Sequence, residues 1–106
     1  MEKTRIERLE ETLESSPDNA FVRYALAIEL ANADRADAAW KQFEILLQRH
    51  PDYSATYYQA GKFLVKQERR DEARRVIVRG IAVTRGQGNL HAQSELEAAL
   101  AELGAP

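Results

Sequence analysis

The fold is decided by two consecutive stretches of 34 residues, DNAFVRYALAIELANADRADAAWKQFEILLQRHP (residues 18–51) and DYSATYYQAGKFLVKQERRDEARRVIVRGIAVTR (residues 52–85). Small and apolar residues recur at the same positions in both stretches, for example Leu30 and Leu64. A period of this length indicates helical units that stack on one another, because one such unit cannot bury its apolar face alone. We therefore expect a protein built from stacked helix pairs.

The recurring positions are matched to the template aromatic-x-x-Leu-Gly-x-x-Tyr, then Ala-x-x-x-Phe, then Pro, for example at Tyr57, Gly61 and Ala73. Over residues 18–85 the chain resembles the tetratricopeptide repeat (TPR) family. The resemblance implies a small stand-alone all-α protein with two full repeats, whose antiparallel helix pairs stack as a short right-handed α-solenoid of about six helices. Three positions depart from the template. Arg23 replaces an aromatic residue and predicts looser packing at that corner, Ala60 replaces a large apolar residue, and Arg85 replaces the closing proline.

A single domain over residues 1–106 is expected. Its expected parts are an N-terminal half-repeat helix (1–16), repeat 1 (18–51), repeat 2 (52–85) and a C-terminal capping helix (89–103). The apolar spacing predicts six helices and no strand. The expected helices span residues 3–14, 19–33, 36–49, 52–67, 71–84 and 89–103. Asp18, Asp52 and Asn89 are the expected helix starts. The apolar side of the last helix is expected to carry Leu90, Leu96, Leu100 and Leu103.

Small residues recur where the two helices of a pair should approach one another. They are Ala27 and Ala39 in the first repeat, and Gly61 and Ala73 in the second. A bulky side chain there would push the helices apart, at about 1–3 kcal/mol for overpacking. Gly61 lies inside a predicted helix, where glycine costs about 1 kcal/mol relative to alanine, so we expect a close approach at that position.

Composition excludes several kinds of protein. The chain has no cysteine, so disulfides and thiolate zinc sites are excluded, and its net charge of −2 does not indicate a nucleic-acid or membrane partner. The sequence has no apolar run long enough to span a bilayer and no signal peptide, so a cytoplasmic location is the default expectation. His50 and His91 lack the spaced carboxylates of a metal site, and no phosphate-binding loop or nucleophile motif is found. We expect a non-enzyme with no cofactor and no metal.

The TPR resemblance implies that the first helix of each pair lines a concave groove that receives an extended peptide or a helix. The groove-facing candidates are Phe21, Tyr24, Ile28 and Ala31 in repeat 1, and Ala55, Tyr58, Gln59, Lys62, Val65 and Lys66 in repeat 2. Tyr24 and Tyr58 are one repeat apart and suit partner anchoring, since tyrosine combines apolar area with a hydroxyl. The alternative is that Phe21 and Tyr24 belong to the core. Trp40 is expected to pack in the core.

Charge is distributed unevenly, with a basic second repeat between acidic ends. Lys62, Lys66 and Arg69 recur at helical spacing, and this basic stripe favours an acidic protein or peptide partner. The alternative is a solvated face balanced by nearby acidic residues. The leading hypothesis is a non-catalytic protein-interaction module that is a monomer or a weak homo-oligomer. The second hypothesis is a structural subunit that self-associates through its acidic first helix and its basic second repeat.

Overall fold

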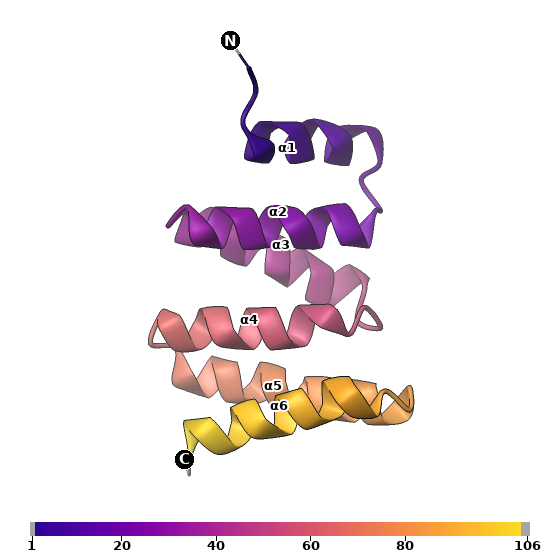
Figure 1. Cartoon of the computed structure of the whole chain (residues 1–106), viewed down its shortest axis with the longest axis vertical. Helices are drawn as coiled ribbons and strands as arrows, with labels where there is room; N and C mark the ends of the chain where they lie inside the picture. Colours follow the sequence, from indigo (N-terminus) through magenta and orange to yellow (C-terminus); the bar gives the residue numbers. More distant parts are fainter. Residues whose placement is uncertain (1, 105–106) are drawn as a thin grey trace. The chain divides into compact units, whose positions relative to one another are not determined.

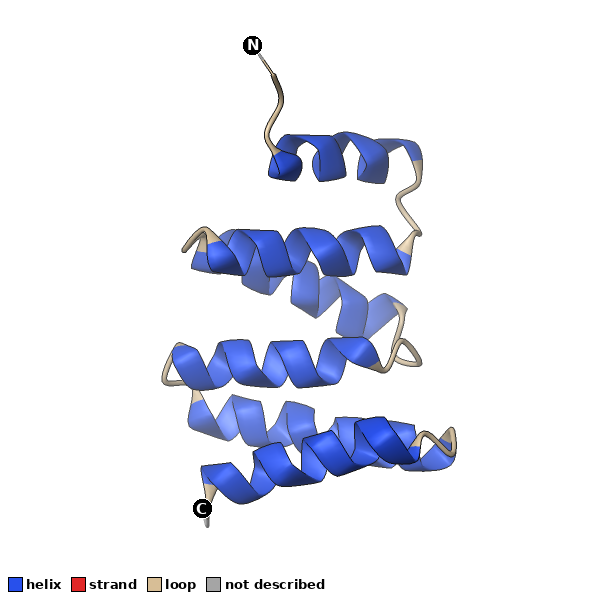
Figure 2. Ribbon diagram, viewed as in Figure 1, coloured by secondary structure: helices blue, strands red, loops and turns tan. Residues whose placement is uncertain are grey.

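The computed structural model describes residues 2–104, and within that range it contains six α-helices and no strand (Figure 1; Figure 2). The helices are α1 (Arg5–Ser15), α2 (Ala20–Asn32), α3 (Ala36–Arg49), α4 (Ala55–Lys66), α5 (Arg70–Gly86) and α6 (Leu90–Leu103). The predicted all-α class is confirmed, and the predicted bounds differ by at most three residues from those observed. Residues 1 and 105–106, the ends of the predicted domain, lie outside the described residues.

The predicted helix starts are right at one position and wrong at two. Asn89 caps α6 as predicted, since its Oδ1 accepts a hydrogen bond from the backbone N–H three residues on, at 3.2 Å. The N-cap of α2 is Asn19 rather than Asp18, because Asn19 Oδ1 accepts the equivalent bond at 3.1 Å. Asp52 does not start α4. The chain first turns over residues 51–54, and the helix begins at Ala55.

Contacts within the chain divide it into two compact units, residues 1–50 and 51–106. In the first unit, α2 and α3 form an antiparallel pair and α1 packs against α2 (Figure 1). The buried apolar residues of this unit are Leu13, Leu26, Ala27, Leu30, Ala39, Phe43, Leu46 and Leu47. Arg23 is only 7% exposed, so the looser packing predicted at this corner is wrong.

The second unit contains the antiparallel pair α4–α5, and α6 packs against both of its helices (Figure 2). The buried apolar residues are Tyr57, Ala60, Phe63, Leu64, Ala73, Ile77, Leu96 and Leu103. The predicted apolar side of α6 is wrong at Leu90, which is 73% exposed in the first turn of the helix, and Leu100 is only half-buried. Trp40 in the first unit is also half-buried, so the prediction of a core residue holds only in part.

The close approach predicted at Gly61 is confirmed. A Cβ built there would lie 2.7 Å from Ile77 Cγ1 on the facing helix. Gly80 marks a second close approach, because a Cβ there would lie 2.5 Å from Tyr57 Cβ. The missing side chains therefore allow α4 and α5 to pack at a distance that any larger residue at these positions would increase.

The turn inside each pair is built in the same way. Asp34 after α2 and Glu68 after α4 both adopt the left-handed conformation, with φ of 59° and 61°. In each turn, the N–H of the following residue bonds to the carbonyl five residues earlier, at 3.0 Å after α2 and 2.9 Å after α4. These bonds are made to carbonyls in the last turn of each helix, where partners within the helix run out. The 34-residue period thus extends to the backbone of the turns.

Candidate functional site

The groove candidates of the first unit lie along α2. Phe21 is 65% exposed, whereas Tyr24 and Ile28 are half-buried. A phenylalanine with this exposure at the start of a helix offers an apolar surface, but a singly exposed apolar residue is common on folded proteins. The core alternative is therefore wrong for Phe21, and Tyr24, which is half-buried, lies between the groove and core predictions.

The groove candidates of the second unit lie along α4. Tyr58 and Gln59 are half-buried, and Lys62 and Lys66 are exposed. Lys62 Nζ lies 5.2 Å from the centre of the Tyr58 ring, a cation–π distance between residues four apart on the helix. Lys66 follows one turn later. The structure therefore places Tyr58, Lys62 and Lys66 in one strip along α4.

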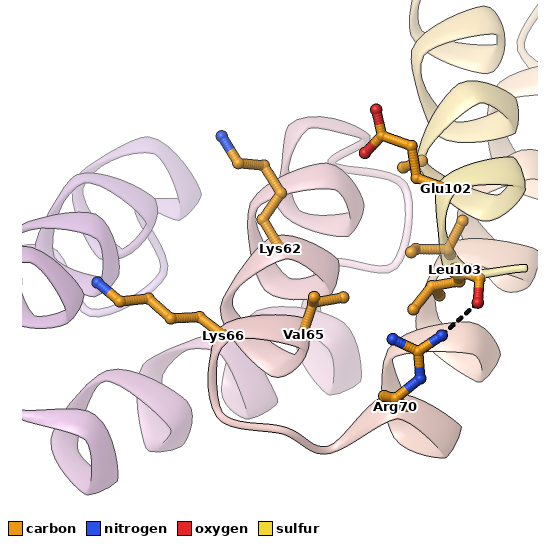
Figure 3. A pocket seen from close by; sticks show the side chains of 8 residues that line it. Lys62, Val65, Lys66, Arg70, Glu102 and Leu103 are labelled. Atoms are coloured by element: carbon orange, nitrogen blue, oxygen red, sulfur yellow. Dashed lines mark hydrogen bonds between the residues drawn. The ribbon is translucent and has the colours of Figure 1, made fainter.

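A surface depression of about 320 Å³ adjoins this strip, and we call it the α4–α6 pocket (Figure 3). It is lined by Lys62, Val65, Lys66, Arg70, Ile77, Ala99, Glu102 and Leu103. Val65, 39% exposed, is its accessible apolar side chain on α4, and Figure 3 shows it pointing towards Leu103. Three cationic residues and one carboxylate also line the pocket, and Figure 3 shows the Lys66 side chain extending away from Leu103.

The wall that α6 contributes to the pocket is held by arginines of α5. Arg70 donates a hydrogen bond from Nη2 to the carbonyl of Leu103 (Figure 3), and Arg74 donates from Nη1 to the carbonyl of Gly104 at 2.8 Å. The last carbonyls of a helix carry partial negative charge and lack partners within the helix, so cations stabilise them. These two bonds fix the end of α6 beside α4 and α5.

The predicted basic stripe is corrected at one position. Arg69 forms two hydrogen bonds with the Glu72 carboxylate, at 2.9 and 2.7 Å, and these bonds lower the pKa of Glu72. Arg70 lines the α4–α6 pocket instead. Within residues 2–104, no carboxylate forms an ion pair with Lys62 or Lys66. These two lysines therefore keep their charge available to a ligand.

Sequence reasoning placed Val65 in the groove but did not place Ala99, Glu102 or Leu103 in any site. No periodic signal could have placed them, because their position depends on how α6 folds back on α4. A volume near 320 Å³ lies at the small end of the range for ligand pockets, about 300–1,000 Å³. The pocket therefore suits one or two side chains of a partner better than a cofactor.

The described residues contain no assembled metal site and no long apolar helix. No group of three or more His, Cys, Asp or Glu side chains within residues 2–104 could hold a metal ion. His91 Nε2 lies 3.4 Å from Glu95 Oε1 on the exposed side of α6, and His50 follows the end of α3. None of the six helices in the described part of the chain is both long and apolar enough to cross a membrane.

Solved structures show the same fold. A tetratricopeptide repeat domain protein from Salinibacter ruber, studied by NMR, is 39% identical and has a TM-score of 0.79, with 83% of this chain and 89% of that chain covered. A protein from Bordetella parapertussis is 30% identical with a TM-score of 0.81, covering 96% of this chain and 89% of that chain. MamA is 22% identical with a TM-score of 0.65, covering 93% of this chain and 61% of that chain, and shares the fold alone.

These likenesses confirm the predicted all-α helical-solenoid class. No family model matches the sequence, and the comparison with curated proteins gives no significant match.

Proposed function

The chain belongs to the tetratricopeptide repeat family, and from this we propose that it is a non-catalytic module that binds a peptide or a helix of another protein. The proposal includes the assignment of residues 18–51 and 52–85 as the full repeats of one domain, flanked by the helices over 1–16 and 89–103. It also includes partner-contact residues on α2 of the first unit and on α4 of the second unit. These residues are Phe21, Tyr24, Ile28, Tyr58, Gln59, Lys62 and Lys66.

The observation that carries the proposal is the strip on α4 together with the pocket beside it. Tyr58 and Lys62 are pre-arranged by their cation–π contact, and Val65 lies open next to them. Aromatic anchors beside an apolar hollow are typical of the residues that dominate binding energy at protein interfaces. The strip therefore supports recognition of a partner more directly than it supports chemistry, which would need convergent acid, base or nucleophilic groups.

The experiment is selection of a random peptide library against the immobilised protein, compared with a variant carrying Tyr58→Ala and Lys62→Glu. The wild type should enrich a related set of peptides, and the variant should bind them about tenfold or more weakly. Lys41→Glu, a charge reversal on α3, is the matched control and should bind as the wild type does. Lys62→Glu alone should also weaken binding, which guards against a folding defect from loss of Tyr58.

Two results would contradict the proposal. The wild type could enrich no related set of peptides, or the double variant could retain unchanged affinity while its circular dichroism matches the wild type. Either result would remove the α4 strip as the contact surface.

Self-association is the second candidate function, and one observation favours it. A shallow depression on α1 is lined by Lys3, Glu7, Glu10, Glu11 and Glu14, so an acidic surface of one copy could meet a basic surface of another. The contact would be head-to-tail. Light scattering should then report a mass that rises with concentration at low salt and falls to the monomer at high salt. A monomeric mass at every concentration would exclude it.

A further inference from the structure

The α4–α6 pocket restricts the chemistry of what it can hold. Its apolar lining consists of Val65, Ile77, Ala99 and Leu103, of which Val65 is exposed, whereas Ile77 and Leu103 are almost fully buried. An apolar hollow of this size gains from excluding water around one apolar side chain. A wholly polar ligand would leave this surface without a matching partner.

The rim of the same pocket is cationic. Its lining includes the cationic residues Lys62, Lys66 and Arg70, and Glu102 is its one lining carboxylate. Arg70 is committed to the Leu103 carbonyl, whereas no carboxylate within residues 2–104 pairs with Lys62 or Lys66. Charge complementarity therefore favours an occupant with carboxylates beside its apolar group.

We propose that the α4–α6 pocket receives the apolar anchor side chain of an acidic peptide whose carboxylates bind Lys62 and Lys66; this rests on the proposed function. The two lysines are one helical turn apart, about 6 Å along the axis. In an extended peptide, residues i and i+2 point to the same side and lie about 6.6 Å apart. The geometry thus favours an extended segment with two carboxylates at i and i+2, next to a large apolar residue.

The protein's own acidic helix fits this description poorly. The side of α1 that carries Glu7, Glu10 and Glu14 is acidic, but its apolar residues Ile6, Leu9 and Leu13 are half-buried or buried. Within the described part of α1, no apolar side chain is left exposed to serve as an anchor. A second copy could match the charge but not the apolar centre, so a separate acidic peptide is the favoured occupant.

The test uses fluorescein-labelled short peptides and fluorescence anisotropy with the whole chain. One peptide carries Glu-x-Glu beside a Leu; a second replaces the Leu by Ala, a third replaces both Glu by Gln, and a fourth replaces both by Lys. The first should bind most tightly, and loss of the Leu or of the carboxylates should each weaken binding about threefold to tenfold. Raising the salt from about 0.05 to about 0.5 M should weaken binding of the first peptide and leave the Gln peptide nearly unchanged.

Protein variants locate the contact. Val65→Glu places a carboxylate in the pocket and should weaken binding of the first peptide about tenfold or more. Val78→Glu is its matched control, because Val78 is 49% exposed on α5 and does not line this pocket. Lys62→Ala with Lys66→Ala should remove most of the salt dependence, whereas Lys41→Ala should not.

The outcomes separate this inference from the proposed function. If the peptide library yields binders but Val65→Glu and Val78→Glu bind them equally, the pocket is not the site and the inference fails alone. If the Lys and Glu peptides bind equally, the acidic preference fails. Two results together would identify a second copy as the occupant and overturn the inference. Light scattering would show self-association that the double variant Glu10→Lys/Glu14→Lys abolishes, and added unlabelled protein would displace the peptide. If no peptide of any composition binds, the proposed function itself fails.

Discussion

In the pair α2–α3, the buried Arg23 bonds back to the proline that precedes its repeat. In α4–α5 the residue 34 positions later, Tyr57, does the same. Arg23 donates from Nη2 to the Pro17 carbonyl at 2.9 Å, and the Tyr57 hydroxyl donates to the Pro51 carbonyl at 2.6 Å. Burial lowers the pKa of Arg23, with a contribution from Arg49, and burial raises the pKa of Tyr57. Two chemically different side chains thus supply a bond to the same carbonyl position of the repeat.

The facing helices differ in a matching way. The Tyr57 side chain lies against Gly80, whereas the position 34 residues before Gly80 holds Leu46, which is fully buried. Arg23 also donates from Nη1 to Gln42 Oε1 at 2.6 Å. The ring of Tyr57 therefore needs the space that a glycine leaves, while the thinner arginine is accompanied by a leucine. The comparison teaches that this repeat position keeps its hydrogen bond to the same carbonyl, although the residue type and the facing side chain both change.

The largest effect is expected from Gly80→Ala. The added Cβ would lie 2.5 Å from Tyr57 Cβ, so α4 and α5 must move apart. We expect a loss of about 3 kcal/mol in the free energy of unfolding, measured by urea denaturation, despite the better helix propensity of alanine. Gly86→Ala in the same helix is the control, because a Cβ there would meet no described atom within 4 Å. A Gly80→Ala protein as stable as the wild type would show that α4 and α5 do not need a glycine at this contact.

Arg23→Tyr tests whether the first pair lacks the space that Gly80 leaves for a tyrosine ring in the second. It should lower the free energy of unfolding by about 2 kcal/mol, because Leu46 occupies the place that Gly80 leaves open in the second pair. In a double-mutant cycle, Leu46→Ala should cost less in the Arg23→Tyr background than in the wild type, with a coupling of about 1 kcal/mol or more. Additive effects within about 0.5 kcal/mol would show that the two positions do not share volume.

Tyr57→Phe measures the contribution of the hydrogen bond to the proline carbonyl, which has an equivalent in each pair. It removes only the hydroxyl that donates to the Pro51 carbonyl, so we expect a loss of about 1 kcal/mol in the free energy of unfolding. Tyr58→Phe, one residue on and half-buried, is the matched control and should change stability by less than about 0.5 kcal/mol. Equal effects of the two substitutions would mean that the Pro51 bond contributes nothing specific.

The smallest effect concerns Glu72 and its pH dependence. The Arg69 side chain lowers its pKa below the ordinary value of 4.5. Above pH 4.5 the Glu72 carboxyl is ionised in both the folded and the unfolded chain, and its stabilisation is fully present. As the pH falls through 4.5, this carboxyl is protonated first in the unfolded chain, and the stabilisation decreases. The loss is complete when the carboxyl is protonated in the folded chain too. The fall in melting temperature between neutral and acidic pH should therefore be slightly shallower in Glu72→Gln and in Arg69→Gln. A slope equal to that of the wild type in both variants would contradict this.

The sequence predicted the helices well because their evidence is local. The period identified Gly61 and Ala27 as small positions, and the spacing of apolar residues located all six helices. Caps were harder, because Asp18 and Asn19 are both good N-cap residues and only the backbone bond to the third N–H distinguishes them. The start of α1 has a local signal of its own, because Thr4 and Glu7 have the spacing of a capping box, which the structure contains.

The candidate site was predicted only on one side. The α4 residues Tyr58, Lys62 and Val65 follow from helical periodicity, so their shared strip could be anticipated. The opposite wall could not, because it depends on long-range contacts of α6. Glu102 and Leu103 reach the pocket only through the turn at residues 87–89 and the bonds from Arg70 and Arg74. The prediction that Leu90 is buried failed for a related reason. Its apolar side chain lies in the first turn of α6, where few residues of the second unit cover it.

The bonds from Arg70 and Arg74 also bear on motion within the second unit. The last turn of a helix is ordinarily the first part to fray, at little cost in free energy. Here the carbonyls of Leu103 and Gly104 are held by residues 33 and 30 positions earlier in the chain. Opening the end of α6 must therefore break these bonds to Arg70 and Arg74, which lie in the first two turns of α5. Amide hydrogen exchange at the end of α6 and at the start of α5 should therefore be correlated. The wall that α6 contributes to the pocket then opens together with the start of α5 rather than by independent fraying of α6.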